Sequence, residues 1–183
     1  GFGTGLNFLC AWQLFEQCAP AGARLHFVSV EKFPLSPPDL RRALDLWPQL
    51  KLQADQLLAQ YVAIHQGFQR LTLAGGRVTL TLLIGDALEQ LPQLDAQIDA
   101  WFLDGFSPAK NPEMWSDEIL AEVGRHDEHG DVRDRGSALA HLGEGGVARS
   151  VEERDSLALI LRLLALIRNG VGSDVLGDAA RFA

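Results

Sequence analysis

The sequence is poor in cysteine, has no long apolar run and carries no excess of positive charge. Its two cysteines, Cys10 and Cys18, lack the spacing of a CxxC pair or of a metal-binding knuckle, which favours free thiols in a reducing compartment. No run of about eighteen apolar residues occurs, so we expect no membrane span. No charged segment followed by an apolar one opens the chain, which predicts a cytoplasmic protein without a secretion signal.

The charge balance argues against a free-standing nucleic-acid binder. The 183 residues carry a formal net charge of -8, with 47% hydrophobic and 22% charged residues, which is typical of an ordinary globular protein. Nucleic-acid-binding domains usually carry a basic patch that meets the phosphates. Any role on RNA must therefore depend on local features of this chain or on a partner.

Short β-rich runs alternate with segments of helical periodicity. Strands are expected at 24–30, 67–73, 78–83 and 98–103, of which the second and third would form a hairpin around Gly75 and Gly76. Helices are expected at 6–17, 40–46, 51–63, 87–91 and 115–123, with Asp39 as the cap of the second. This alternation favours an α/β layer fold with a largely parallel sheet.

A glycine-rich turn, GFGTG, opens the chain and leads into the first expected helix. Glycines allow positive φ and close approach of the backbone to a ligand, and the N–H groups of a helix N-terminus can face a carboxylate or phosphate. A tight turn with no ligand is the competing interpretation. Because a strand normally delivers such a turn, we interpret the chain as lacking its first strand.

Acidic residues follow three of the expected strands, at Glu31, Asp86 and Asp104. In open α/β sheets, ligands bind at the carboxyl ends of the strands, and an acid after the second strand accepts hydrogen bonds from ribose hydroxyls. Each acid alone could equally be a helix cap or a turn residue. The three in this order favour a nucleotide-like ligand. The GxGxG pattern followed by Leu6 favours S-adenosylmethionine over a nicotinamide dinucleotide, whose usual pattern is GxGxxG.

The segment DGFSPAKNPEMW, residues 104–115, is long and specific. With GFGTGLNFL, FVSVEKFPL, IGDAL and DAWFL, in family order over about residues 1–118, it resembles the methyltransferase domain of the tRNA 5-methylaminomethyl-2-thiouridine biosynthesis bifunctional protein. The resemblance implies a Rossmann-like class I S-adenosylmethionine-dependent methyltransferase. Its acceptor would be the aminomethyl group of the wobble uridine in tRNA. Larger family members add an FAD-dependent oxidase domain, which this sequence lacks, so a fused or separate oxidase is an expected partner.

The same resemblance assigns the cofactor-binding residues. Gly1, Gly3 and Gly5 would line the methionine end of S-adenosylmethionine. Glu31 would bind the ribose, whereas Asp86 and Ala87 would border the adenine.

The acceptor side of the site would lie in the DGFSPAKNPEMW segment. Asp104 would face the acceptor amine, where a carboxylate can hold the ammonium form and help to remove its proton. The residues that would shape the uridine pocket are Phe106, Pro108, Lys110 and Asn111. Trp101, Phe102 and Trp115 could stack on a base or pack in the core, and both interpretations stay open.

The family pattern stops after about Glu118, and the composition changes at 124. We expect a partial methyltransferase domain at 1–123, truncated at its first strand and disrupted after about residue 120. A divergent, partly disordered tail with one apolar helix near 157–167 would follow at 124–183. The codons for residues 126–132, HDEHGDV, can read one base later as Thr-Thr-Ser-Thr-Ala-Thr-Phe. Because that is strand-like, we hypothesise a frameshift near 122–125.

Two other functions remain open beside tRNA methylation. One is a small-molecule N-methyltransferase on the same fold, because a fold alone does not choose its acceptor. The other is an inactive fragment, which the divergent tail favours. No metal site is expected: the histidines and acids at 126–129 have the closeness of zinc ligands, but they lie in that divergent tail.

Overall fold

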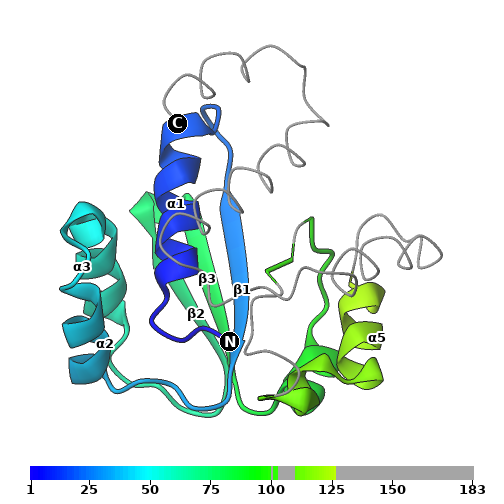
Figure 1. The fold of residues 1–183 in the computed structure, drawn as a ribbon. Coiled ribbons are helices and arrows are strands. Elements are labelled where there is room, and N and C mark those ends of the chain that lie inside the picture. The colour runs from blue at the N-terminus through cyan, green and yellow to red at the C-terminus, as the bar shows by residue number, and fades with distance from the viewer. Residues whose placement is uncertain (100, 103–109, 127–183) are drawn as a thin grey trace. The chain divides into compact units, whose positions relative to one another are not determined.

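The computed structural model describes residues 1–99, 101–102 and 110–126. The chain divides into two units, Gly1–Asp95 and Ala96–Ala183, and each is described by itself. The first unit contains a sheet and its covering helices (Figure 1). The expected site residues Asp104, Phe106 and Pro108 lie outside the described residues, as do tail residues 127–183 with the expected apolar helix.

The first unit begins with the glycine turn and helix α1, Leu6–Cys18, which confirms the helix expected at 6–17. Gly5 precedes the helix in the left-handed conformation, with φ 71°, and its N–H donates to the Phe2 carbonyl oxygen at 2.8 Å. Only glycine adopts this conformation without strain, so the sequence ends the turn and starts the helix at this residue.

The sheet is formed by β1 (Leu25–Glu31), β2 (Gly67–Leu73) and β3 (Val78–Ile84), in the order β1-β3-β2. β1 runs parallel to β3, with Glu31 beside Ile84, whereas β2 pairs with β3 in antiparallel fashion. The expected hairpin is therefore confirmed. The expectation of a largely parallel sheet is wrong for the described strands, because the hairpin makes one of the two pairings antiparallel.

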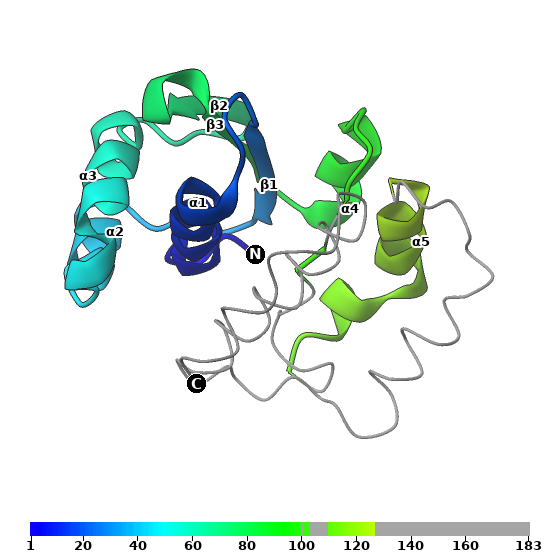
Figure 2. The same cartoon turned by 90° about the horizontal axis from the view of Figure 1, so that it is seen from above.

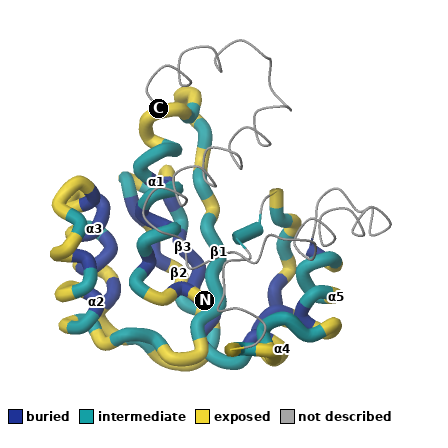
Figure 3. The backbone as a smooth tube through the Cα atoms, in the orientation of Figure 1, coloured by how far each residue is buried: buried dark blue, intermediate teal, exposed yellow. Residues whose placement is uncertain are grey.

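One face of the sheet carries the hydrophobic core of the first unit. Side chains alternate along the strands, so every second residue of β2 and β3 points toward the helices. Figure 2 shows α1, α2 and α3 on one side of the sheet, and Figure 3 shows exposed residues on the outer sides of α2 and α3. The core combines aromatic residues of α1 with strand aliphatics, among them Phe8, Trp12, Leu71, Leu73, Val78, Leu80 and Leu82.

Helices α2 (Pro37–Leu44) and α3 (Lys51–Gln60) follow β1, joined by the 3-10 helix η1 (Pro48–Leu50). The expected cap of α2 was Asp39, but Ser36 is the N-cap and accepts a hydrogen bond from the Asp39 N–H. Proline is favoured in the first turn of a helix, which starts α2 three residues earlier than expected.

A short 3-10 helix η2 (Ala74–Gly76) joins β2 to β3. After β3 come the single-turn helix α4 (Ala87–Gln90) and the 3-10 helix η3 (Leu91–Gln93). Asp86 is the N-cap of α4, with its side chain accepting from the Leu88 N–H. The acid after β3 therefore ends the strand and starts the next helix.

In the second unit, the 3-10 helix η4 (Pro112–Trp115) precedes helix α5 (Asp117–Arg125). The helix expected at 115–123 is thus confirmed, shifted because Ser116 is its cap. The strand expected at 98–103 is not found: among its described residues only Ile98 makes a bridge, and Trp101 and Phe102 are half-buried without strand structure. Among the described residues, no helix is long and apolar enough to span a bilayer.

Candidate cofactor site

The carboxylate of Glu31 holds the glycine turn against the end of β1. Its Oε2 accepts a hydrogen bond from the Gly3 N–H at 2.8 Å, and its Oε1 accepts one from the Phe33 N–H at 2.9 Å. A carboxylate has about four acceptor positions, so two remain for a ligand. The half-buried Glu31 can therefore organise the turn and accept two further hydroxyl groups.

The three glycines of the turn differ in the space around them. A Cβ at Gly1 would lie 3.1 Å from Oε2 of Glu31, and a Cβ at Gly5 would lie 2.7 Å from Cζ of Phe2. Gly3, at φ 54°, has no described atom within 4 Å of that position, so its surface is open. A ligand can approach the backbone at Gly3, whereas Gly1 and Gly5 are glycine because the turn itself is tight.

The ring of Phe2 packs between Gly5 of the turn and the ring of Tyr61. Phe2 is buried and stacks on Tyr61, with ring centroids 6.4 Å apart. The Tyr61 hydroxyl donates to the Leu35 carbonyl oxygen at 3.0 Å, and burial, with a smaller contribution from the charge of Glu31, raises the pKa of Tyr61. Sequence reasoning missed this support. Its signal was an aromatic residue between two glycines.

Asp86 lies next to Glu31 because β1 and β3 are parallel and end together. The Gly85 N–H donates to the Glu31 carbonyl oxygen at 3.0 Å, which fixes the two strand ends side by side. Lys32 Nζ donates to Oδ2 of Asp86 at 2.8 Å, and Oδ1 accepts from the Leu88 N–H at 3.0 Å. The hydrogen bond from Lys32, followed by that from Leu88, lowers the pKa of Asp86. Lys32 was not expected at the site, although its position directly after Glu31 was a signal.

Ala87 and Gln90 are the buried residues of α4, the helix that Asp86 caps. Both are buried, and a Cβ at Gly85 would lie 2.9 Å from Nε2 of Gln90, so the amide packs against the strand end. Oε1 of Gln90 is buried and has no partner among the described residues. A buried acceptor without a donor is costly, and a ligand or water donating an N–H or O–H is the usual solution.

The expected acceptor residues are described only in part. Lys110 is exposed and Asn111 is half-buried, directly before η4. Both belong to the second unit. Among the described residues, no group of three His, Cys, Asp or Glu side chains could hold a metal ion. His126 is buried, with Nδ1 2.9 Å from the Ala96 carbonyl oxygen, and residues 127–129 lie outside the described part.

The donor and acceptor set fits an adenosine-like ligand with a charged amino-acid end. Paired acceptors at Glu31 suit a ribose diol, and the carboxylate of Asp86 suits an exocyclic amine. The N-cap of α1 is Gly5, which has no side chain to cap the helix, so its first N–H groups can face a carboxylate. This set of groups is the one expected of a Rossmann-like nucleoside site.

Comparison with known proteins agrees with that class. Residues 48–134 match the family described as S-adenosyl-L-methionine-dependent methyltransferase. The match confirms the predicted fold class and S-adenosylmethionine as the cofactor of that class.

The particular resemblance is to the tRNA 5-methylaminomethyl-2-thiouridine biosynthesis bifunctional protein MnmC. The chain is 81% identical to the protein of Pseudomonas fluorescens strain Pf0-1, 76% to that of Pseudomonas syringae pv. tomato strain DC3000 and 74% to that of Pseudomonas aeruginosa strain PAO1. Each match covers 125 residues, which are 68% of this chain and 19% of the relative. The resemblance predicted from the sequence is confirmed, and the match spans about a fifth of the length of these relatives.

Proposed function

We propose that this chain is part of an enzyme that transfers a methyl group from S-adenosylmethionine to the aminomethyl group of the wobble uridine in tRNA. The observation that carries the proposal is the 81% identity, over 125 residues, to a protein named for the biosynthesis of 5-methylaminomethyl-2-thiouridine in tRNA. The geometry of Glu31, Asp86 and the glycine turn supports the cofactor half of the reaction.

In this proposal the first unit holds the cofactor, which supplies an electrophilic methyl group on a sulfonium. Gly1, Gly3 and Gly5 line the methionine end: Gly3 leaves the backbone open to the ligand, and Gly1 and Gly5 allow the tight turn that presents it. Glu31 accepts the two ribose hydroxyls with the acceptor positions that Gly3 and Phe33 leave open. The carboxylate of Asp86, with Ala87 beside it, receives the adenine amine.

The acceptor half is assigned to the segment after residue 103. An alkyl amine attacks only when neutral, so Asp104 is proposed to bind the ammonium form, take up its proton and orient the nitrogen. Phe106, Pro108, Lys110 and Asn111 are proposed to shape the pocket for the uridine. Holding both reactants in line contributes most of the rate, because methyl transfer is a displacement.

Three further features belong to the proposal. A tRNA substrate places the reaction in the cytoplasm. A flavin-dependent oxidase, fused or separate, would act on the same nucleotide, in keeping with the word bifunctional in the names of the relatives. The boundary at 123 and 124 is attributed to a frameshift near 122–125. Several independent reads of the gene that keep one intact frame would refute that attribution.

The test uses the 183-residue chain with S-adenosylhomocysteine and with tRNA carrying 5-aminomethyl-2-thiouridine. Calorimetry should show binding of S-adenosylhomocysteine. Labelled methyl groups should pass to the tRNA from a complete relative with the same motifs, whereas the 183-residue chain itself should transfer few or none, because its tail departs from the family pattern. Asp104→Asn should lower the methylation rate by about 10²–10⁴ with cofactor affinity unchanged. Asp99→Asn, at an exposed acid five positions earlier in the sequence, is the matched control and should keep the full rate.

The outcomes separate the alternatives. Cofactor binding with methylation of small amines but of no tRNA would favour a small-molecule N-methyltransferase. Cofactor binding without any methyl transfer would favour an inactive fragment. Absence of cofactor binding would refute the site built on Glu31 and Asp86.

A further inference from the structure

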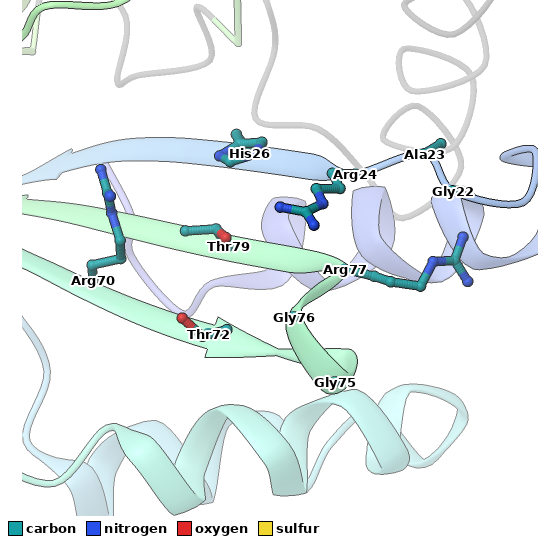
Figure 4. A pocket seen from close by; sticks show the side chains of 10 residues that line it. All are labelled: Gly22, Ala23, Arg24, His26, Arg70, Thr72, Gly75, Gly76, Arg77 and Thr79. Atoms are coloured by element: carbon teal, nitrogen blue, oxygen red, sulfur yellow. The ribbon is translucent and has the colours of Figure 1, made fainter.

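An open hollow of about 510 Å³ runs from the amino ends of β1 and β3 to the middle of the sheet, whereas the candidate cofactor site lies at the carboxyl ends of these strands. Its lining includes three arginines and a histidine from separate places in the chain. Figure 4 shows these side chains, Arg24, Arg70, Arg77 and His26. No acidic residue is found among the described residues that line it.

The strand register explains why this surface is polar. Thr79 pairs with His26 on one side and with Thr72 on the other, and Arg70 lies beside Thr81 in the next row. Alternate residues of the same strands face the core of α1 and α3, so this row faces away from it. The sequence therefore places hydroxyls, imidazole and guanidinium groups where burial does not require apolar residues.

The arginines of this hollow have no carboxylate partner within the part of the chain that the structure describes. The described ion pairs of the first unit involve other cations: Lys32 with Asp86, Arg42 with Asp39 and Lys51 with Asp55. The guanidinium of Arg77 lies 5.2 Å from the Phe15 ring centroid, an interaction that occupies its face and leaves its N–H edges for an anion. Unpaired cations gathered in a chain of net charge -8 indicate an anionic ligand.

The arrangement suits a row of phosphates better than a single one. Figure 4 shows Arg70 at one end of the hollow and Arg77 at the other, with Arg24 and His26 between them. Guanidinium groups that converge would hold one phosphate, whereas groups spread along a groove follow a backbone. Of the described residues that line the hollow, His26 alone is aromatic, so they offer little surface for stacking bases.

We propose that this hollow binds the sugar–phosphate backbone of the RNA substrate, away from the nucleotide that reacts. The inference rests on the proposed function, which supplies RNA as the polyanion. The hollow runs from Arg24 and Arg77 at the amino ends to Arg70, which lies beside Thr81 in the middle of β3. It therefore lies about 10–20 Å from the carboxyl ends of the strands and holds the body of the RNA rather than the reacting base. Backbone contacts position an RNA without reading its sequence, so binding here is salt-dependent and indifferent to sequence.

The test measures binding of fluorescently labelled tRNA to the 183-residue chain by anisotropy at several salt concentrations, without cofactor. The pocket variant combines Arg24→Gln, Arg70→Gln and Arg77→Gln. A control variant removes three charges elsewhere, by Arg41→Gln, Arg42→Gln and Lys51→Gln. The pocket variant should bind roughly tenfold or more weakly, and the slope of log affinity against log salt should be shallower by about two. The control should lose much less.

Further measurements keep the result decisive. Arg70→Gln alone, at an exposed side chain on β2, should make the slope shallower by about 0.7–0.9 without disturbing the fold. Unrelated RNA of equal length should lose the same affinity as tRNA in the pocket variant. Equal losses in pocket and control variants, or no RNA binding by the unmodified chain, would overturn the inference. The inference would also be overturned if the unmodified chain bound inorganic phosphate at matched ionic strength while the pocket variant kept its full affinity for RNA.

Failure of this inference can be told from failure of the proposed function. S-adenosylhomocysteine binding in the same preparation reports on the carboxyl ends of the strands alone. Intact cofactor binding with equal RNA losses in both variants refutes only the hollow. RNA binding that depends on the three arginines, without cofactor binding, refutes only the cofactor site.

Discussion

The two ends of the β1–β3 strand pair carry opposite charges. At the carboxyl ends, Glu31 and Asp86 accept hydrogen bonds from backbone N–H groups and from Lys32. At the amino ends, Arg24 and Arg77 are exposed and have no carboxylate partner among the described residues. Because the strands are parallel, like ends meet, and a short sequence signal at each strand end becomes a cluster in space.

The two ends also differ in how their charged groups are held. The acids are tied to the glycine turn and to α4, so their acceptor positions are fixed before a ligand arrives. The arginines of the hollow are all exposed, and Arg77 also lies over the ring of Phe15. Fixed acceptors suit a small ligand that must be placed accurately, whereas exposed cations suit a polyanion that is attracted over a distance.

The strongest way to sharpen this comparison is Glu31→Ala. Two ribose hydroxyls would lose a charged acceptor, each such hydrogen bond contributing roughly 1.5–3 kcal/mol, so S-adenosylhomocysteine affinity should fall tenfold or more. Calorimetry measures the loss, and RNA anisotropy on the same variant should show no weakening. Glu31→Gln keeps the shape and one acceptor oxygen and should lose less. Unchanged cofactor affinity in Glu31→Ala would remove this residue from the site.

Gly5→Ala should act on the turn with a smaller effect. The new Cβ would meet the Phe2 ring at 2.7 Å, at a φ of 71° that alanine rarely adopts, so we expect a cost of about 1–3 kcal/mol in stability. Gly3→Ala at φ 54° is the matched control, because it has the strain without the contact. Urea unfolding should rank Gly5→Ala below Gly3→Ala. The reverse ranking would show that the contact with Phe2 does not shape the turn.

Much of the first unit could be predicted from its sequence. The helix at 6–18 and the strand ending at Glu31 lie within one residue of their expected bounds, because glycine and apolar periodicity act locally. Which side of α1 is buried was less evident: Phe8 and Trp12 face the core, whereas Leu6 and Leu14 are half-buried. Several sets of apolar residues in α1 have helical spacing, and packing against the sheet determines which set is buried.

The pairing of distant residues could not be predicted. Lys32 meets Asp86, 54 residues further along the chain, because of the register of β1 and β3, which periodicity does not determine. The arginine hollow depends on the same register. The acids at the strand ends were predictable because any parallel sheet gathers its carboxyl ends, whatever the register.

At the amino ends, Arg77→Ala should separate structural from binding roles. Its guanidinium over Phe15 should contribute about 0.5–1 kcal/mol of stability, whereas exposed Arg24 has no such ring contact among the described residues. Urea unfolding should show a loss for Arg77→Ala and almost none for Arg24→Ala, and both variants should weaken RNA binding. Equal stability of the two variants would show that the contact with Phe15 does not stabilise this end.

The smallest expected effect concerns the Lys32–Asp86 ion pair, which joins the two strand ends. The folded-state pKa of Asp86 is lowered, chiefly by the hydrogen bond from Lys32, so the pair stabilises the fold above the ordinary aspartate pKa of about 3.9. That contribution is lost as the pH falls through the lowered pKa, because a protonated Asp86 no longer attracts the ammonium group. Both side chains are partly exposed, so a double-mutant cycle of Lys32→Met and Asp86→Asn should give a coupling of about 0.2–1 kcal/mol at pH 7. The asparagine can still cap α4, which keeps the Leu88 contact out of the comparison.

A carboxyl titration by NMR should show the pKa of Asp86 rising toward its ordinary value in Lys32→Met. Coupling that persists after Asp86 is protonated, or a titration that Lys32→Met leaves unmoved, would mean that the backbone N–H of Leu88 alone holds the charge of Asp86.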